Sequence, residues 1–438
     1  MATVSDGRED GLGGKARILV LLGVLAAVAG VAIGFLGGAF RWLLVEAAAL
    51  REELSRWAHT VPLGWLVVIL FGAAGAVVAV LVVRASPRSA GSGIQDVEAV
   101  HRAQLPPPPL SVVPTRFAGG LAAIGSGMVL GREGPTVHMG AALGAGVGRA
   151  ARLGDDDLRL LQSAMSGAGL AVAFNAPVGG ALFVLEEVAK SANFRLLVPT
   201  VMGVGVAIAC SRLVLGDHPD FAVPDIPNPP LFTLPMFLVF GVVVGLAGAA
   251  YNGLVVGLLS LATRIRRVPA VVRVAVVGAL IGLALFIDPL MVGGGDALAQ
   301  LLLAGQALAP PLLLLYLAVR FLAGPLSYST GTPGGLFAPL LALGALFGTI
   351  FAQFAQLLAP QLGTDFIIAM AIVGMSTLFA AVVRAPLTGI LLIIEMTAVT
   401  TVTVPMLIAA VGAVVTAMLV KSRPVYDSLR ALELHREP

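Results

Sequence analysis

The sequence of 438 residues has few charged side chains. Charged residues make up 12% of the chain, whereas soluble proteins contain about 25%. This scarcity, together with 58% hydrophobic residues, excludes an ordinary soluble protein and predicts an integral membrane protein. Membrane helices tolerate glycine and proline, and the 53 glycines and 28 prolines indicate that several helices are broken.

Cysteine and histidine are also scarce. The single cysteine, Cys210, excludes an intrachain disulfide. The five histidines are scattered without the spacing of a metal site and without an HExxH motif, so we expect no metal and no cofactor. The basic residues form no cluster with interleaved aromatic residues, so nucleic acid is not an expected partner.

The loop charges give the chain a membrane topology. The loop at 216–230 has three acids and no Lys or Arg, whereas four arginines follow residue 263. By the positive-inside rule the first loop is external and the second is cytoplasmic, which places both termini in the cytoplasm of a multi-pass inner (plasma) membrane protein. We expect a cytoplasmic N-terminal segment, a first transmembrane repeat, an external loop, a second transmembrane repeat and a cytoplasmic tail at residues 1–17, 18–215, 216–230, 231–423 and 424–438. Polar connections are expected at residues 51–59 and 149–159.

A charged hexapeptide, Gly131 to Thr136, stands between two apolar runs that carry no Asp, Glu, Lys or Arg. Glu133 is therefore expected at membrane depth, where a carboxylate costs about 2.5–3.5 kcal/mol and indicates a functional site. Pro135 suits the first turn of a helix, so the segment predicts a helix that begins inside the membrane with N–H groups free to bind an anion. The alternative is a glycine turn at the membrane surface with a solvated Arg132–Glu133 pair.

Two further segments predict helix starts. In the sequence Gly91-Ser92-Gly93-Ile94-Gln95, Ser92 is expected to act as an N-cap hydroxyl, with the acids Asp96 and Glu98 in the first turn. An ordinary capped interfacial helix is the alternative. The sequence Gly334 to Pro339 opens another apolar helix.

Arg320 lies within an apolar segment and needs a partner, which we expect to be Asp96 or Glu98.

The chain contains a weak internal repeat. A shift of 209 residues superposes 175–187 on 384–396, and Ala, Pro, Gly, Leu and Glu coincide. A shift of 204 lays the glycine and proline of GREGP on those of GLFAP. Chance coincidence is the alternative, but the two motifs follow in order at nearly equal offsets. Repeats with broken helices predict a site near the midplane, and three converging N-termini make it anion-binding.

With these motifs the chain resembles the CLC family of chloride channels and chloride/proton antiporters, from about residue 18 to 432. The family's three anion-site motifs correspond to GSGIQ at 91–95, GREGP at 131–135 and GLFAP at 335–339. The resemblance implies an all-α polytopic membrane protein, in which an inverted repeat of tilted and broken helices surrounds a central anion site. It also implies a homodimer with one pathway per subunit. Gln95 departs from the family's usual proline, a change that leaves the N–H donors in place.

The resemblance further implies roles for single residues. Glu133 would be the gating and proton glutamate, and Glu187 the inner proton-transfer glutamate. The anion-binding residues would be Ser92, Gly93, Ile94, Arg132, Gly134, Leu336, Phe337 and Tyr426. Ser92 and Tyr426 would supply hydroxyl groups, and Phe337 with its neighbour would supply backbone N–H groups. For Tyr426, the sequence alone indicates only an interfacial aromatic anchor.

The expected function is secondary active exchange of chloride for protons, and not enzymatic catalysis. Deprotonated Glu133 would compete with chloride for one positive site. A passive chloride channel is the alternative within the family, and fluoride or nitrate are alternative anions, although Ser92 resembles the serine of chloride-selective members. A cation/proton transporter is disfavoured because cations prefer the carbonyl ends of half-helices. An intramembrane protease would need a nucleophile–base pair, which no spacing suggests. The short tail leaves no room for the regulatory domains that eukaryotic members often carry.

Overall fold

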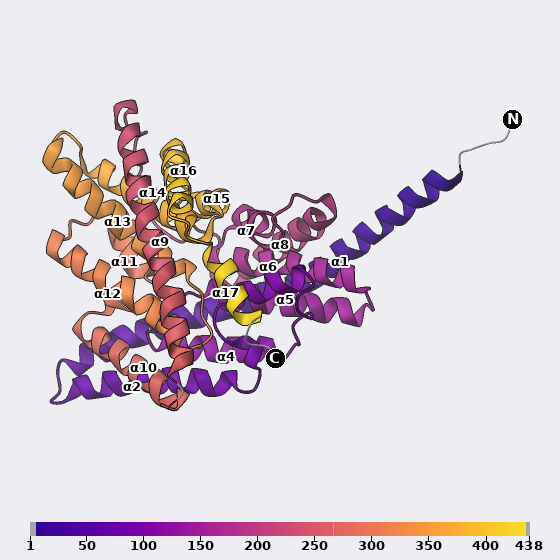
Figure 1. Ribbon diagram of the computed structural model, residues 1–438, viewed down its shortest axis with the longest axis horizontal. Coiled ribbons are helices and arrows are strands. Elements are labelled where there is room, and N and C mark those ends of the chain that lie inside the picture. The colour runs from indigo at the N-terminus through magenta and orange to yellow at the C-terminus, as the bar shows by residue number, and fades with distance from the viewer. Residues whose placement is uncertain (1–5, 266, 435–438) are drawn as a thin grey trace.

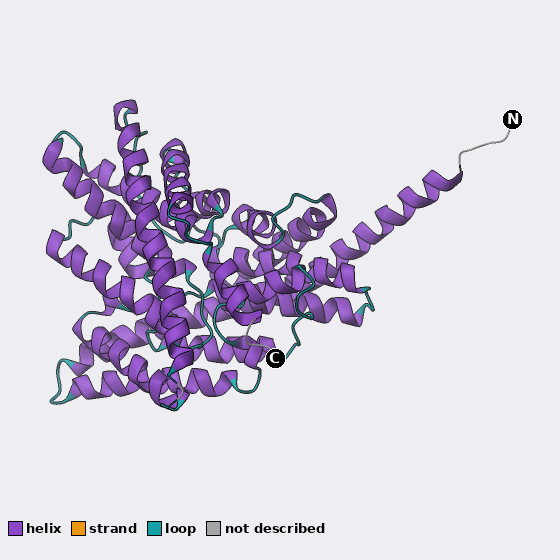
Figure 2. Cartoon of the chain, viewed as in Figure 1, coloured by secondary structure: helices purple, strands orange, loops and turns teal. Residues whose placement is uncertain are grey.

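The computed structural model describes residues 6–265 and 267–434, and side chains from residue 16 onward. Throughout these residues the chain is helical apart from connecting loops and one isolated bridge (Figures 1 and 2). The α-helices are α1 (Asp6–Ala58), α2 (Gly64–Val83), α3 (Ile94–His101), α4 (Val112–Gly125), α5 (Glu133–Ala150), α6 (Asp155–Phe174), α7 (Pro177–Phe183), α8 (Phe194–Leu215), α9 (Leu234–Arg264), α10 (Ala270–Ile287), α11 (Asp296–Leu303), α12 (Pro310–Ser329), α13 (Phe337–Leu358), α14 (Thr364–Val383), α15 (Pro386–Thr397), α16 (Thr403–Leu419) and α17 (Val425–Leu434). Short 3-10 turns lie at Pro87–Ser89, Leu231–Thr233 and Pro289–Met291, and a π-helical turn, η2, spans Val184–Val188.

Eight of the described helices are long and apolar enough to cross a membrane. They are α1, α2, α8, α9, α10, α12, α13 and α14. Since a span needs about 20 apolar residues, the chain is a multi-pass membrane protein. The shorter helices, such as the seven-residue α7, are too short to cross a membrane alone and lie between the spans in the chain.

The central helix pairs pack through small residues. Helix α5 lies against α6, and α13 lies against α14. A Cβ atom on Gly169 would lie 2.1 Å from the carbonyl oxygen of Thr136, and one on Gly374 would lie 2.1 Å from that of Gly344. Lipid tails are as apolar as the side chains, so the hydrophobic effect does not drive helices together in a membrane. Close packing of the backbones through small residues stabilises the helix pair instead.

The internal repeat is confirmed by backbone geometry. Helix α6 ends at Asn175 with φ 48°, and α14 ends at Arg384 with φ 72°, both left-handed conformations that terminate a helix. In both halves an Ala-Pro dipeptide then begins the next helix with proline at its first position. The predicted break after residue 174 and its counterpart after residue 383 are therefore the same structure used twice.

Two predicted polar connections are largely helical, with a loop left at 151–154. Helix α1 continues to Ala58, so residues 51–58 belong to the first helix, and Arg51 is satisfied there by donating to the carbonyl oxygens of Ile124 and Gly125. Helix α5 extends to Ala150, and residues 155–157 form the first turn of α6, where acidic side chains favour the positive end of a helix. Part of the predicted N-terminal segment, residues 1–5, and the tail end, 435–438, lie outside the described residues.

Candidate anion site

The three predicted helix starts meet near the centre of the fold. Gly131 and Gly335 exchange two backbone hydrogen bonds, each 2.8 Å, and so hold the N-termini of α5 and α13 side by side. The start of α3 packs against the same point, because a Cβ atom on Gly134 would lie 2.7 Å from the carbonyl oxygen of Ser92. The predicted convergence is confirmed, and three helix N-termini aim their positive ends at one place.

The Glu133 carboxylate lies at this place. Its side chain is fully buried, and its Oε1 accepts a hydrogen bond of 2.6 Å from the Phe337 backbone N–H. Gly335 leaves the room for it, since a Cβ atom there would lie 2.0 Å from Glu133 Oε1. The alternative of a solvated surface turn is wrong. Glu133 is thus itself bound as an anion at the N-terminus of α13.

Ser92 and Tyr426 contribute two buried hydroxyl groups. Ser92 is not the N-cap of α3, because Gly93, with φ 85°, holds that position and no side chain caps the helix. Its Oγ and the Tyr426 Oη are buried, and neither has a hydrogen-bond partner among the described residues. The Tyr426 ring packs edge-on against Phe337 with centroids 5.7 Å apart, so Tyr426 is no interfacial anchor. Unpaired buried hydroxyl groups next to converging helix starts are donors suited to an anion.

The remaining predicted anion-site residues lie at the same helix starts. These are Gly93, Ile94, Gly134 and Leu336, all of them buried. Gln95 replaces the family proline without disrupting α3, which remains helical from Ile94 to His101. The N–H donors of this helix start are therefore retained, as expected.

Arg132 differs from the other predicted anion-site residues because its guanidinium group faces acids. It lies 3.1 Å from Asp220 Oδ2 and 3.6 Å from Asp296 Oδ1, and it also donates to the carbonyl oxygen of Ala173. Arg41 pairs with the same Asp220 carboxylate. The Arg132 side chain thus ties the start of α5 to the 216–230 loop, and only the backbone of this residue belongs to the helix start.

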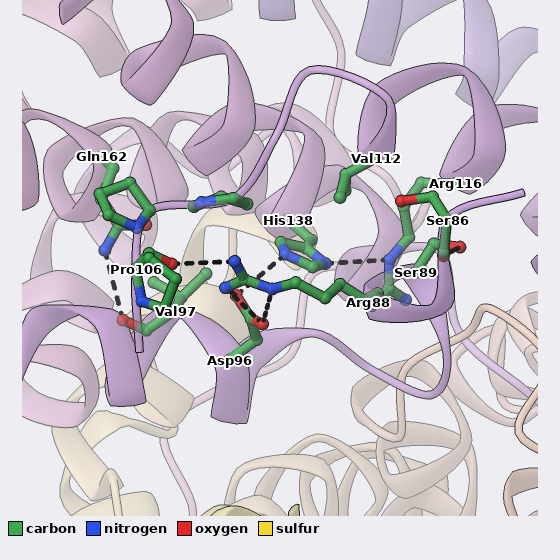
Figure 3. A network of polar contacts seen from close by, with 12 residues as sticks. Ser86, Arg88, Ser89, Asp96, Val97, Pro106, Val112, Arg116, His138 and Gln162 are labelled. Carbon is green, nitrogen blue, oxygen red and sulfur yellow. Dashed lines mark hydrogen bonds and ion pairs between the residues drawn. The ribbon is translucent and has the colours of Figure 1, made fainter. Parts of the chain in front are cut away.

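A buried arginine clamps the loop that carries Ser92. Arg116 on α4 donates to the carbonyl oxygens of Gly91 and Ala90, and its side chain is fully buried. Figure 3 shows this side chain in one network with His138, Asp96 and Arg88. Its Nε donates to His138 Nδ1 over 3.1 Å, so the ring proton of His138 lies on Nε2, which is 3.2 Å from Asp96 Oδ1. Arg88 completes the network with two bonds of 2.8 Å to Asp96. The clamp therefore joins the start of α3 to α5.

The expected partner of Arg320 was wrong. Its guanidinium group donates to three backbone carbonyl oxygens, those of Leu290, Val292 and Gly293, at 2.8–2.9 Å. The two acids proposed for it are engaged elsewhere, Asp96 with Arg88 and Glu98 with Arg430. Carbonyl dipoles at an irregular turn satisfy this buried cation without an acid.

Glu187 belongs to none of the three helix starts and lies in the π-helical turn η2 that follows α7. Its side chain is 1% exposed, and its Oε1 has no hydrogen-bond partner among the described residues. The turn η2 packs against α3, which carries another buried acid, Glu98. Sequence reasoning identified Glu187 through resemblance, but it missed Arg116 and His138. Their signal was ionisable side chains within apolar segments, the same signal that identified Glu133.

Comparison with known proteins identifies relatives of the whole chain. A family model described as voltage gated chloride channel matches residues 74–418. A protein of Vibrio parahaemolyticus named H(+)/Cl(-) exchange transporter ClcA is 38% identical over 423 residues, which are 94% of this chain and 89% of that protein. A protein of the same name from Cronobacter sakazakii is 35% identical over 97% of this chain and 91% of its own.

Solved structures agree with the fold. A slow cyanobacterial Cl-/H+ antiporter superposes with a TM-score of 0.89 at 30% identity, covering 95% of this chain and 98% of that one. A CLC-type fluoride/proton antiporter superposes with a TM-score of 0.78 at 21% identity, covering 94% and 98%, which supports the fold alone.

Proposed function

We propose that this chain, which belongs to the voltage-gated chloride channel (CLC) family, exchanges chloride for protons across the membrane. The main support for this proposal is the hydrogen bond from the Phe337 N–H to the Glu133 carboxylate. It places an ionisable group in the very position that an anion would take at the start of α13. Relatives named as H(+)/Cl(-) exchange transporters support the same conclusion.

The exchange follows from competition for this position. The Glu133 carboxylate and chloride are both anions, so the N-terminus of α13 holds only one of them at a time. A proton taken up by Glu133 makes the side chain neutral, which weakens its bond to the Phe337 N–H and lets chloride replace it. Loss of that proton restores the carboxylate and returns it to the site. Each cycle therefore links one protonation change to chloride movement.

Chloride would be coordinated by the donors around the helix starts. The proposed ligands are the hydroxyl groups of Ser92 and Tyr426 and the backbone N–H of Phe337. Further N–H groups come from the starts of α3, α5 and α13, around Gly93, Ile94, Gly134 and Leu336, with Arg132 contributing through its backbone. All of these donors are neutral, so chloride is bound without a fixed positive side chain and can leave again. The exchange then needs no cofactor.

Glu187 would supply protons from the cytoplasmic side. It is buried and is not among the groups at the three helix starts, so we expect a change in its charge to leave the chloride ligands in place. We assign it the inner proton-transfer role and Glu133 the gating role. Both termini would face the cytoplasm of the inner membrane, with residues 216–230 external, as the loop charges favour. A homodimer with one pathway per subunit is also proposed, and the mass of the purified protein in detergent tests it.

Parallel recording of chloride efflux and proton uptake in proteoliposomes tests the function. Wild type is expected to move both ions, and Glu133→Ala only chloride. Glu53→Gln, which removes an exposed carboxylate on α1, is the matched control and should behave as wild type. Chloride movement without proton movement in wild type would instead establish a passive channel. Fluoride or nitrate moving much faster than chloride would overturn the anion assignment.

A further inference from the structure

Two carboxyl groups are buried on neighbouring elements. Glu98 lies on α3 and Glu187 in η2, which packs against α3, and their side chains are 0% and 1% exposed. Each has an Oε1 atom that is buried and without a donor among the described residues. Two ionised carboxylates buried on neighbouring elements repel one another and accept only, so this arrangement favours a state in which one of the two groups carries a proton.

The C-terminal helix α17 determines the charge around this pair. Arg430 Nη1 donates to Glu98 Oε2, while Arg430 Nη2 donates to Asp427 Oδ1 over 2.8 Å. Asp427 in turn accepts from Lys190 Nζ at 3.1 and 3.2 Å. Two cations thus face Asp427 and the carboxyl pair. If the carboxyl pair holds one proton, Asp427 and the pair together carry two negative charges. These balance the two positive charges of Arg430 and Lys190.

We propose that Arg430 is a positioning residue of the proton pathway, which keeps Glu98 ionised so that the shared proton resides on Glu187. The inference rests on the proposed chloride/proton exchange. A guanidinium group bonded to Glu98 stabilises its carboxylate form, whereas no cation among the described residues is bonded to Glu187. Glu187 is then the acid that releases a proton toward Glu133, and Glu98 remains ionised beside it.

Asp427 and Lys190 hold Arg430 in place and do not themselves carry the proton. Burial raises the pKa of Asp427, but the hydrogen bond and charge of Lys190, with the charge of Arg430, outweigh burial and leave the pKa below its usual value. Asp427 therefore stays ionised over the pH range in which a transporter works. Because Tyr426 precedes Asp427 on the same helix, α17 connects a hydroxyl group of the anion site to the cation that sets the proton's location.

Infrared spectroscopy of the purified protein tests where the proton lies, independently of transport. The absorption band of a protonated carboxyl group from the pair is expected in wild type and absent from Glu187→Gln, because Arg430 keeps Glu98 ionised. The band should return in the double variant E187Q/R430Q, where Glu98 has lost its cation and takes up a proton. A band that persists in E187Q would overturn the inference.

Proton flux in proteoliposomes supplies the second test. R430Q should slow proton flux about tenfold and move its pH dependence upward by about one pH unit, since the pair holds its proton more tightly without the cation. Chloride efflux should not change, and R430K should restore proton flux. Arg195→Gln, which removes another cytoplasm-facing cation with an acid partner, is the matched control and should resemble wild type.

Different results would contradict the role of Arg430 and the chloride/proton exchange. Wild-type proton flux with an unchanged R430Q variant would overturn the role of Arg430 and leave the exchange intact. Absence of proton flux in wild type would overturn the exchange. In that case the infrared result still decides which carboxyl group of the pair is protonated.

Discussion

Glu186 and Glu395 each cap the helix that carries the other. The Glu395 carboxylate, on α15, accepts hydrogen bonds from the backbone N–H groups of Val178 and Gly179 at the start of α7. The Glu186 carboxylate, in the turn η2 that continues α7, accepts from those of Leu387 and Thr388 at the start of α15. The two glutamates coincide under the 209-residue shift, so this exchange of caps joins equivalent positions of the two repeats.

Glu395→Ala should destabilise the fold without changing the coupling of ions. The substitution removes the acceptor for two N–H groups at the start of α7, which costs about 1 kcal/mol, with 2 kcal/mol as the upper end for a lost cap. Thermal unfolding in detergent should show the loss, and Glu186→Ala should produce a similar one. A variant of normal stability with an altered ratio of chloride to protons would show that the carboxylate takes part in transport.

Glu133→Gln should abolish proton coupling and preserve chloride movement. Glutamine is nearly the same size but cannot exchange a proton, and its neutral side chain competes weakly for the Phe337 N–H. Chloride efflux should equal or exceed that of wild type while proton uptake disappears. Proton uptake driven by chloride in this variant would remove Glu133 from the proton pathway.

Ser92→Pro should raise the ratio of nitrate to chloride flux. The substitution removes a hydroxyl group that has no hydrogen-bond partner among the described residues and is free to serve the anion. The loss of one hydrogen bond to a charged ligand is worth about 1.5–3 kcal/mol, so chloride binding should weaken by at least tenfold. Ser92→Thr, which keeps the hydroxyl group, is the control. An unchanged ratio in the proline variant would limit Ser92 to a structural role.

Asp427→Asn should lower stability by the same amount at pH 7 and pH 5. Against the effect of burial, Lys190 and Arg430 hold the pKa of Asp427 below its usual value. A depressed pKa stabilises the fold above the unfolded value, which is about 3.9, and this stability is lost only as pH falls through the lower folded value. The expected loss is about 1 kcal/mol, as for partly exposed ion pairs, and thermal unfolding at the two pH values measures it. A difference that vanishes by pH 5 would contradict the depressed pKa.

The sequence predicted the elements whose local chemistry determines them. The Ala-Pro dipeptides at 176–177 and 385–386 end one helix and begin another in both repeats, as glycine and proline patterns indicate. The convergence of the starts of α3, α5 and α13 followed from the same breaks and from the resemblance. The helix breaks depend on a few adjacent residues, so the sequence alone was sufficient to find them.

Contacts between distant segments could not be predicted in the same way. Arg320 was expected to bind an acid, but an irregular turn about thirty residues earlier offers it three carbonyl oxygens. Ser92 was expected to cap α3, but the positive φ of Gly93 ends the preceding loop and leaves the hydroxyl group free. In each case the packing of the chain determines what the side chain contacts. Residue type and spacing in the sequence do not specify that packing.

Chloride-driven proton uptake at clamped voltage distinguishes chloride/proton exchange from a passive chloride channel. Purified wild type is placed in liposomes with an outward chloride gradient, equal potassium on both sides and a potassium ionophore. Exchange predicts that the lumen acidifies although no proton gradient or voltage is imposed, and that Glu187→Gln moves chloride without acidification. Chloride efflux in wild type with no change in luminal pH would contradict the exchange and identify a passive chloride channel.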